Sequence, residues 1–224
     1  MRTGGAVGDD VADLRARLRH VHWIGGGSGA GKSTVARRIA ERYGLRLYRT
    51  DDVMAEHAAR SSPERCPSLT AFKAMDMDER WLNRSPEVML DTFHWYRGEA
   101  FDLIVEDLLR LPPGPGVVVE GFRLLPHLVA PLLAAPRRAV WLLPTPEFRR
   151  AAFVSRGTLW DIAARTSDPG RALDNLLVRD RMFTERLAGE VRRLGLPGIE
   201  VDTATTEAAL TGRVATALGL GPDR

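Results

Sequence analysis

Five short apolar runs alternate with longer amphipathic segments along the 224 residues of the chain. The runs lie at about 21–24, 45–48, 117–120, 139–143 and 198–201. Runs of this length, bounded by Gly, Pro or charged residues, are typical of buried strands in a parallel sheet. Parallel strands need crossover connections, which helices can supply. The pattern therefore predicts an α/β fold, with a five-stranded parallel sheet and helices on both faces.

The segments between these runs carry helix signals. A helix is expected at 33–43, because Gly44 follows it as a C-terminal cap would. A second helical stretch is expected at 85–111, with a possible break at Gly98, because a cap serine is followed by proline in the first turn. Composition predicts a loop at 61–68 and a mobile segment at 157–170. Further helices are expected at about 10–19, 54–58, 145 onward, 171–194 and 206–218.

A complete G-x-x-x-x-G-K-[ST] loop follows the first apolar run, from Gly26 to Ser33. Its glycines let the backbone turn tightly, so that successive N–H groups point at phosphate oxygens. Lys32 would reach the β- and γ-phosphates, Ser33 would place its hydroxyl on Mg²⁺, and the helix that follows would add its positive end. The loop predicts a site for ATP or another nucleoside triphosphate with Mg²⁺. Its binding residues are expected to be Gly26, Gly27, Ser28, Gly29, Ala30, Gly31, Lys32, Ser33 and Thr34.

The use of lysine supports this interpretation. The chain has 32 Lys and Arg residues, of which only Lys32 and Lys73 are lysine. The wide planar fork of arginine cannot replace a compact ammonium inside a phosphate cradle. The alternative, a Gly-rich turn with an incidental lysine, does not explain why lysine stands at this position.

Bulk composition limits the classes of protein that remain. A chain of 224 residues with 44% hydrophobic residues can bury one sizeable core, and we expect a single domain over 1–224. The formal charge of +3 is spread along the chain, so it does not indicate a nucleic-acid partner. Cys66 is the only cysteine, which excludes an internal disulfide and a cysteine-based metal site made by this chain alone. No apolar stretch approaches membrane-spanning length, so a cytoplasmic protein with no membrane partner is expected. The oligomeric state is left open.

Several polar residues stand where the predicted strands end. They are the loop at 26–33, the pair Asp51 and Asp52, Glu120, and the segment after Leu143. Ligands of parallel sheets bind at the carboxyl ends of the strands. We therefore expect these residues to converge on one crevice.

With these motifs, the chain resembles the P-loop small-molecule kinases of the nucleoside- and shikimate-kinase type, which include chloramphenicol phosphotransferase and similar antibiotic phosphotransferases. Besides the loop, the segment 47–52 is similar to the base-bearing D-T-D turn of that family, and 119–126 is similar to its E-G-x-x-x-x-P stretch. The resemblance implies a three-layer P-loop NTPase sandwich. It also implies a helical acceptor lobe at about 53–111 and a lid at about 149–171.

The resemblance also implies roles for three acidic residues. Asp51 matches the catalytic base, which would orient the acceptor hydroxyl and take its proton. Asp52 is the reserve candidate, and either residue could instead cap the helix that follows. Glu120 would stand beside Ser33 and hold Mg²⁺ through water, unless it binds the backbone amides of the turn at Phe122.

Lid arginines that close over the phosphates are expected after the fourth strand. Arg150, Arg165 and Arg171 each have an acidic neighbour at helical spacing and are expected to form solvated pairs. Arg149 and Arg156 have none and are the expected lid residues, with an ordinary surface position as the alternative.

The acceptor lobe is rich in aromatic residues. Phe93 and Tyr96 share a helical face with Met89, which fits either a core or a pocket. An apolar, aromatic lobe favours a sizeable, partly apolar alcohol or nucleoside over a small sugar acid. The residues that we expect near the acceptor are Asp51, Asp52, Phe93, Tyr96, Arg97 and Arg123.

The leading hypothesis is an ATP-dependent phosphotransferase that acts on a hydroxyl of a small molecule, such as a nucleoside-like antibiotic in self-resistance. A nucleoside or nucleotide kinase of metabolism is the near alternative, and the nucleotide version would need arginines such as Arg84, Arg97 and Arg123 at the acceptor phosphate. A regulatory P-loop NTPase without a small-molecule acceptor is the second alternative. The chain lacks the N-K-x-D base reader of GTPases and the L-S-G-G-Q signature of transporter ATPases.

Overall fold

The computed structural model describes residues 5–156 and 158–221, and their side chains over 11–152 and 161–221. Five parallel strands form one sheet in the order β2-β3-β1-β4-β5. Their bounds are β1 (Val21–Gly26), β2 (Arg46–Arg49), β3 (Val117–Glu120), β4 (Ala139–Pro144) and β5 (Gly198–Val201). The predicted five-stranded parallel sheet is confirmed, and β1 lies at its centre.

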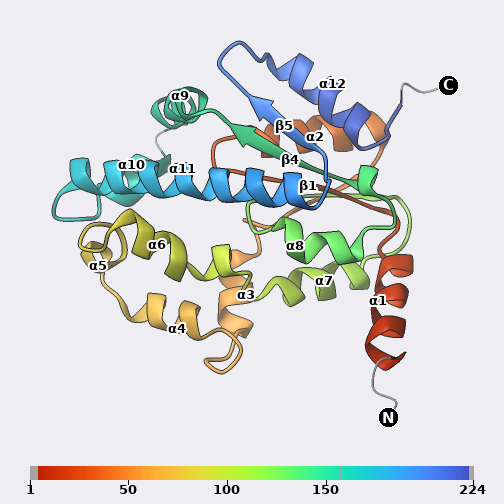
Figure 1. Cartoon of the computed structure of the whole chain (residues 1–224), viewed down its shortest axis with the longest axis horizontal. Coiled ribbons are helices and arrows are strands. Elements are labelled where there is room, and N and C mark those ends of the chain that lie inside the picture. The colour runs from red at the N-terminus through yellow and green to blue at the C-terminus, as the bar shows by residue number, and fades with distance from the viewer. Residues whose placement is uncertain (1–4, 157, 222–224) are drawn as a thin grey trace.

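Each face of the sheet is covered by helices, because alternate strand residues point to opposite sides. On one face, Ile24 and Val118 pack with α2 (Lys32–Tyr43) and α12 (Glu207–Ala217). On the other face, Trp23 and Val119 pack in a core with residues of the remaining helical layer. That layer contains α1 (Gly5–Arg17), α7 (Phe101–Arg110), α8 (Pro126–Val129) and α11 (Pro169–Arg193). Figure 1 shows the two layers above and below the strands, which make the three-layer sandwich of a P-loop NTPase.

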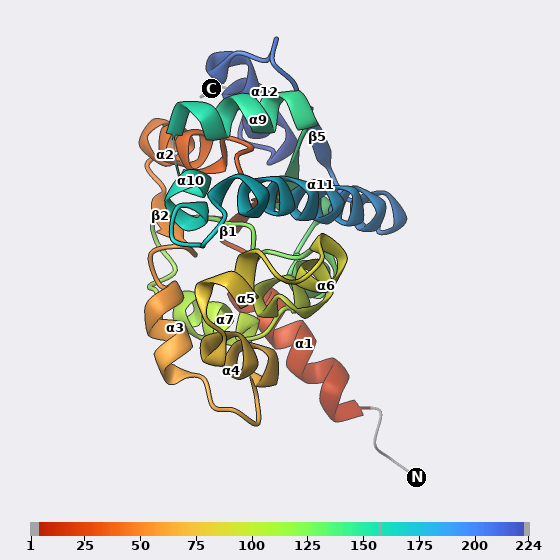
Figure 2. The same cartoon turned by 90° about the vertical axis from the view of Figure 1, so that its left-hand side faces the viewer.

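A helical lobe lies between β2 and β3 in the sequence. It comprises α3 (Met54–Arg60), α4 (Pro67–Ala74), α5 (Met77–Trp81), α6 (Pro86–Thr92) and the 3₁₀ helix η1 (His94–Arg97), and it leads into α7. Figure 2 shows these helices grouped on the side of the molecule away from α2, α9 and α12. The loop expected at 61–68 is shorter, because Pro67 starts α4. The possible break at Gly98 in the stretch 85–111 is confirmed, since its φ is 81°, and a second interruption follows α6 at Phe93.

The segment after β4 is more helical than its composition predicted. It forms α9 (Pro146–Arg156), α10 (Thr158–Ala163) and α11, so the segment expected to be mobile at 157–170 contains a helix; residue 157 lies outside the described residues. The glycines at 157 and 170 suggested irregular structure, but Gly170 lies in the first turn of α11. Asp168 caps that turn through a 3.1 Å bond from the Arg171 amide.

Other boundaries agree with expectation to within a few residues. β3 and β5 have the predicted bounds, and Gly44 ends α2 with φ 61°, as a left-handed cap requires. The helix α1 begins before the expected residue 10, and the short elements at 126–138 were not expected. These are α8, η2 (Ala130–Leu132) and η3 (Pro136–Arg138). Within the described ranges, no helix is both long enough and apolar enough to span a bilayer.

Candidate active site

The loop between β1 and α2 has the backbone geometry of a phosphate cradle. Gly26, Gly29 and Gly31 have φ values of 131°, 75° and 81°, a region that favours glycine. A Cβ at Gly26 would lie 2.1 Å from the Leu142 carbonyl oxygen on β4. Because Gly26 has no side chain, the backbone at the start of the loop can lie directly against β4.

Lys32 spans this loop from the first turn of α2. Its side chain is 8% exposed, and its Nζ donates to the carbonyl oxygen of Gly27 at 2.7 Å. The N-cap of α2 is Gly31, which provides no side-chain cap. The start of the helix therefore receives no cap from this residue, and amides at the start of a helix are groups that bind phosphate. The loop fits a nucleoside triphosphate.

Glu120 lies at the end of β3, in register with Ile24 of β1. Its side chain is 1% exposed, and its Oε1 has no hydrogen-bond partner among the described residues, although Arg49 Nε lies 3.5 Å away. Burial raises the pKa of the carboxyl, against the opposing influence of Lys32 and a hydrogen bond with Ser33. The expected closeness of Glu120 to Ser33 is thus present, and these contacts are not those of a side chain bound to the turn at Phe122.

A hydroxyl and a carboxylate side by side are ligands that suit Mg²⁺, either directly or through water. No group of three or more His, Cys, Asp or Glu that could hold a metal exists among the residues described. Phosphate oxygens and water would therefore complete the coordination around Ser33 and Glu120, as is usual for Mg²⁺ at nucleotide sites.

We expect Glu120→Gln to raise the Mg²⁺ concentration needed for half-maximal MgATP turnover, by about threefold to tenfold. The same change should raise the melting temperature of the free protein at neutral pH. The pKa of Glu120 is raised in the folded state, so its neutral form contributes to the stability of the protein. This contribution is complete below the pKa of the unfolded state, and it is lost as the pH rises through the pKa of the folded state. Glutamine removes that loss. Turnover titrated with Mg²⁺ and thermal melts between pH 4 and pH 8 test both parts.

The control for this prediction is Glu41→Gln, which changes an exposed glutamate of α2. It should alter neither the Mg²⁺ requirement nor the pH dependence of melting. A Glu120→Gln protein with an unchanged Mg²⁺ profile would rule out a metal role for this carboxylate.

Asp51 and Asp52 differ in their surroundings. Asp52 is 58% exposed and lies 3.3 Å from Arg49 Nη1 in an ion pair. Asp51 is also exposed, but its charge acts on two buried groups, Glu120 and Arg123. Neither aspartate caps α3, because the cap residue is Val53, which makes no side-chain cap bond. Because Arg49 of β2 is in register with Glu120 of β3, Asp51 lies at the same end of the sheet as Glu120, where a base would have to lie.

Of the two expected lid arginines, the described side chains include only Arg149. It is 2% exposed, and its Nη2 donates to the hydroxyl of Thr184 on α11. Burial lowers its pKa, which the charge of Asp180 opposes. The Thr184 hydroxyl also lies against Gly27 of the phosphate loop, because a Cβ at Gly27 would be 2.5 Å from it. Thr184 therefore connects Arg149 to the loop. The side chain of Arg156 lies outside the described residues.

A buried polar cluster beside the loop was missed from the sequence. Arg179 Nη2 donates to Asp180 Oδ1 at 2.6 Å, and the Tyr96 hydroxyl donates to the same oxygen at 2.9 Å. Tyr96 also shares a side-chain hydrogen bond with Ser28 of the loop, and burial raises its pKa. The signal was available, because Arg179 and Asp180 interrupt the apolar face of α11 between Leu176 and Phe183.

The aromatic residues of the lobe pack against one another. Tyr96 stacks on Phe183 with ring centroids 3.7 Å apart, and Phe93 contacts the rings of Phe72, Trp81 and Tyr96. The guanidinium of Arg179 lies 5.1–5.3 Å from the centroids of Trp81, Phe93 and Tyr96. Of the two arrangements considered, core and pocket, Tyr96 is buried as a core residue would be, whereas Phe93 is only partly buried. An acceptor role for Phe93 or Tyr96 stays a prediction.

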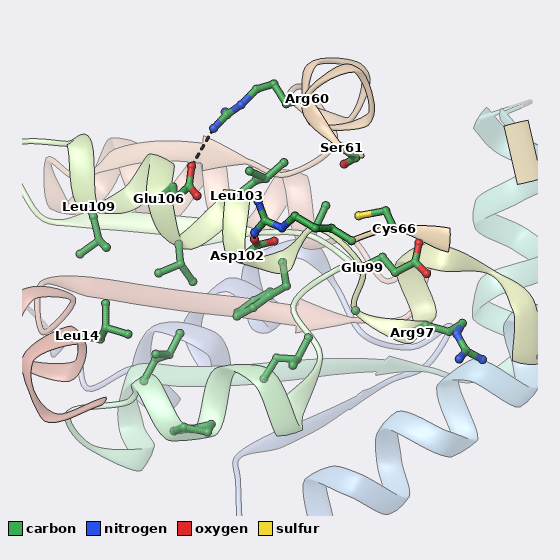
Figure 3. Close-up of a pocket in the computed structure, with 18 of the residues that line it drawn as sticks. Leu14, Arg60, Ser61, Cys66, Arg97, Glu99, Asp102, Leu103, Glu106 and Leu109 are labelled. Atoms are coloured by element: carbon green, nitrogen blue, oxygen red, sulfur yellow. Dashed lines mark hydrogen bonds and ion pairs between the residues drawn. The ribbon is translucent and has the colours of Figure 1, made fainter. Parts of the chain in front are cut away.

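The two expected acceptor arginines differ in exposure and in their partners. Arg97 is exposed and donates to the Asp91 carbonyl oxygen. Arg123 is 2% exposed and bonds within the protein. Figure 3 shows Arg97 at one end of a groove of about 940 Å³, whose other end is at Leu14 of α1. Lys32, Asp51 and Glu120 do not line this groove, so it is separate from the phosphate site.

One comparison with known proteins agrees with this geometry. Residues 25–89 match the AAA_17 family, which is described as an AAA domain. With the sheet order and the loop, this match supports a kinase-like P-loop NTPase fold and a nucleotide-binding enzyme. No curated protein matches the chain. A crystal structure of an uncharacterized protein from Eubacterium ventriosum ATCC 27560 is 14% identical, with 90% of this chain and 98% of that chain covered and a TM-score of 0.46.

Proposed function

We propose that this protein is an ATP-dependent phosphotransferase that moves the γ-phosphoryl group to a hydroxyl of a small molecule. The observation that carries the proposal is the position of Asp51. Its exposed carboxylate lies close enough to Glu120 and Arg123 to act on their charges, at the strand ends where Lys32 and Ser33 form the phosphate site.

The reaction assigned to this site balances with the residues present. The acceptor oxygen forms a bond to the γ-phosphorus, the bond from that phosphorus to the β–γ bridging oxygen breaks, and ADP leaves. Asp51 accepts the hydroxyl proton, and Lys32 stabilises charge on the phosphate oxygens. Mg²⁺, when bound, neutralises further phosphate charge. Arg149 contributes positive charge behind the loop.

The arginines of the lobe favour an alcohol over a nucleotide as acceptor. Arg84 uses its donors on the carbonyl oxygens of Glu79 and Arg80 and on the hydroxyl of Thr92. Arg123 is buried, and Arg97 is exposed at the groove away from the phosphate loop. The donors of Arg84 and Arg123 are thus engaged within the protein, which supports an acceptor without a phosphate. Phe93 is only partly buried among the rings of the lobe, and an apolar surface of this kind supports a partly apolar alcohol, with nucleoside-like antibiotics as the first class to test.

The test is a panel of acceptors incubated with MgATP, with products identified by mass spectrometry. The panel contains nucleosides, nucleoside antibiotics, other antibiotic alcohols, sugar acids and nucleoside monophosphates. We expect a phosphate ester of a partly apolar alcohol and no transfer to the monophosphates. Transfer to a monophosphate would instead identify a nucleotide kinase. Steady hydrolysis that no alcohol changes, together with a stable protein complex, would identify a regulatory NTPase.

A further inference from the structure

A chain of buried and partly buried polar side chains runs from α7 to the turn that carries Asp51. It consists of Tyr48, Asp107, His57 and Arg123, and we call it the Arg123 network. His57 is 0% exposed and Arg123 is 2% exposed. The four residues come from β2, α7, α3 and the segment after β3, and α3 and α7 lie side by side in both views (Figures 1 and 2).

The hydrogen bonds of the Arg123 network have a fixed direction. Arg123 Nη1 lies 3.1 Å from His57 Nδ1, and His57 Nε2 lies 2.9 Å from Asp107 Oδ2. A guanidinium can only donate, so Nδ1 must accept, and the imidazole carries its proton on Nε2 and donates it to Asp107. The Tyr48 hydroxyl donates to the same carboxylate oxygen at 2.7 Å. Asp107 therefore orients His57, and His57 orients Arg123.

The network holds a buried charge on Arg123 and a partly buried one on Asp107. Burial works against the ionised form of Asp107, but hydrogen bonds from Tyr48 and His57 outweigh it and hold its pKa below the usual value. Burial lowers the pKa of Arg123 to about 10, which leaves it charged at neutral pH. Well-packed apolar residues can stabilise a core as much as such charges do. The network is therefore better explained by what it orients than by stability.

Arg123 connects the base-bearing turn to the acceptor lobe. Its Nη1 lies 3.5 Å from the carbonyl oxygen of Thr50, the residue directly before Asp51, and its Nη2 donates to the carbonyl oxygen of Ala100 at 3.1 Å. Ala100 has a φ of 58°, which is strained for a residue with a Cβ, and it immediately precedes α7. The guanidinium also lies 4.1 Å from the centroid of the Trp95 ring, which limits its movement. One side chain thus fixes both the turn before Asp51 and the start of α7.

We propose that Arg123, oriented by His57 and Asp107, is a positioning residue that sets the direction of Asp51 toward the acceptor hydroxyl. The inference rests on the proposed function, because it assigns the network a role only if Asp51 is the base. Displacement of a reacting group by about 1 Å can lower turnover by up to a hundredfold. Loss of the network should therefore slow transfer, while MgATP binding at the loop remains intact.

A matched pair of substitutions at His57 separates the two hydrogen bonds. His57→Asn retains an acceptor near the position of Nδ1, so Arg123 keeps its partner. His57→Gln retains a donor near the position of Nε2, so Asp107 keeps its hydrogen bond from residue 57. Arg123 then loses its hydrogen bond to residue 57. We expect His57→Gln to lower MgATP turnover roughly tenfold, and His57→Asn to retain most of it. Calorimetry should give both variants the MgATP dissociation constant of the unmodified protein.

A double-mutant cycle between His57→Gln and Asp51→Asn distinguishes positioning from a structural role. Turnover is measured as MgATP consumption with water as the acceptor, and again with each alcohol of the panel. If His57 acts through Asp51, His57→Gln should cost less than about twofold once Asp51 is already asparagine. Equal losses in both backgrounds would overturn the inference. Nitrogen NMR of labelled histidine supplies a second readout, because an Nδ1 of His57 that carries a proton contradicts the network as described.

Failure of the proposed function would look different. An Asp51→Asn protein with the turnover of the unmodified protein removes Asp51 as the base, whatever His57 does. An Asp51→Asn protein that is slow, together with a His57→Gln effect of equal size in both backgrounds, leaves the base in place and removes only the positioning role of Arg123.

Discussion

Lys32→Met is expected to lower phosphoryl transfer from MgATP by about a thousandfold, the largest effect of any single substitution in the chain. Lys32 is 8% exposed and already bonds to the Gly27 carbonyl oxygen at 2.7 Å, so its ammonium is held over the loop before phosphate arrives. Methionine has a similar length and no charge. The loop should fold, but nothing would replace the positive charge that meets the β- and γ-phosphates. Initial rates at saturating MgATP measure the loss.

Two further variants complete this experiment. Lys73→Met changes the only other lysine, which is exposed on α4, and should leave transfer unaltered. Lys32→Arg keeps the charge but should restore less than a tenth of the rate, roughly, because a planar guanidinium does not fit the space of a compact ammonium. Transfer by Lys32→Met at the rate of the unmodified protein would show that the loop is not the phosphate site.

The sheet and the phosphate loop could be predicted because their signals are local. The run 117–120 is apolar to its last residue and became β3 with the same bounds. Gly44 marks the end of α2 because only glycine adopts φ 61° without strain. The neighbours of Glu120 could be inferred as well, since the carboxyl ends of parallel strands lie at one edge of the sheet.

The polar interior could not be predicted from neighbours in the sequence. Arg123 was expected near the acceptor, but its partners at positions 50, 57 and 100 come from three separate segments. No helical or strand period connects those positions, so only the fold brings them together. Arg179 and Asp180 are different, because their places on the apolar face of α11 marked them as buried polar residues.

The short helices of the lobe were also difficult to predict from the sequence. Pro67 and the N-cap residue Asp76 start helices of 8 and 5 residues, lengths at which an isolated helix is not stable in water. Packing of the Phe72 and Trp81 rings, whose centroids lie 5.3 Å apart, supplies the missing stabilisation. Because that packing is tertiary, the sequence did not predict the two helices at 67–81.

Asp51→Asn is expected to lower transfer to the acceptor alcohol by about a hundredfold, with little change in the affinity for MgATP. Asparagine can still orient a hydroxyl, but it cannot take the proton as the bond to phosphorus forms. The turnover number should fall while the acceptor KM changes little, because the lost interaction belongs to the transition state. Stopped-flow rates with the alcohol found in the panel, and calorimetry with MgATP, measure the two parts.

Asp52→Asn is the matched comparison, because it makes the same chemical change at the adjacent residue. Asp52 is 58% exposed and pairs with Arg49 at 3.3 Å, and an exposed pair of this kind contributes about 1 kcal/mol or less. A loss of no more than about threefold is therefore expected. If Asp52→Asn were the slow variant and Asp51→Asn the active one, the base would be Asp52. The Arg123 network would then hold a turn whose first aspartate has no part in proton transfer.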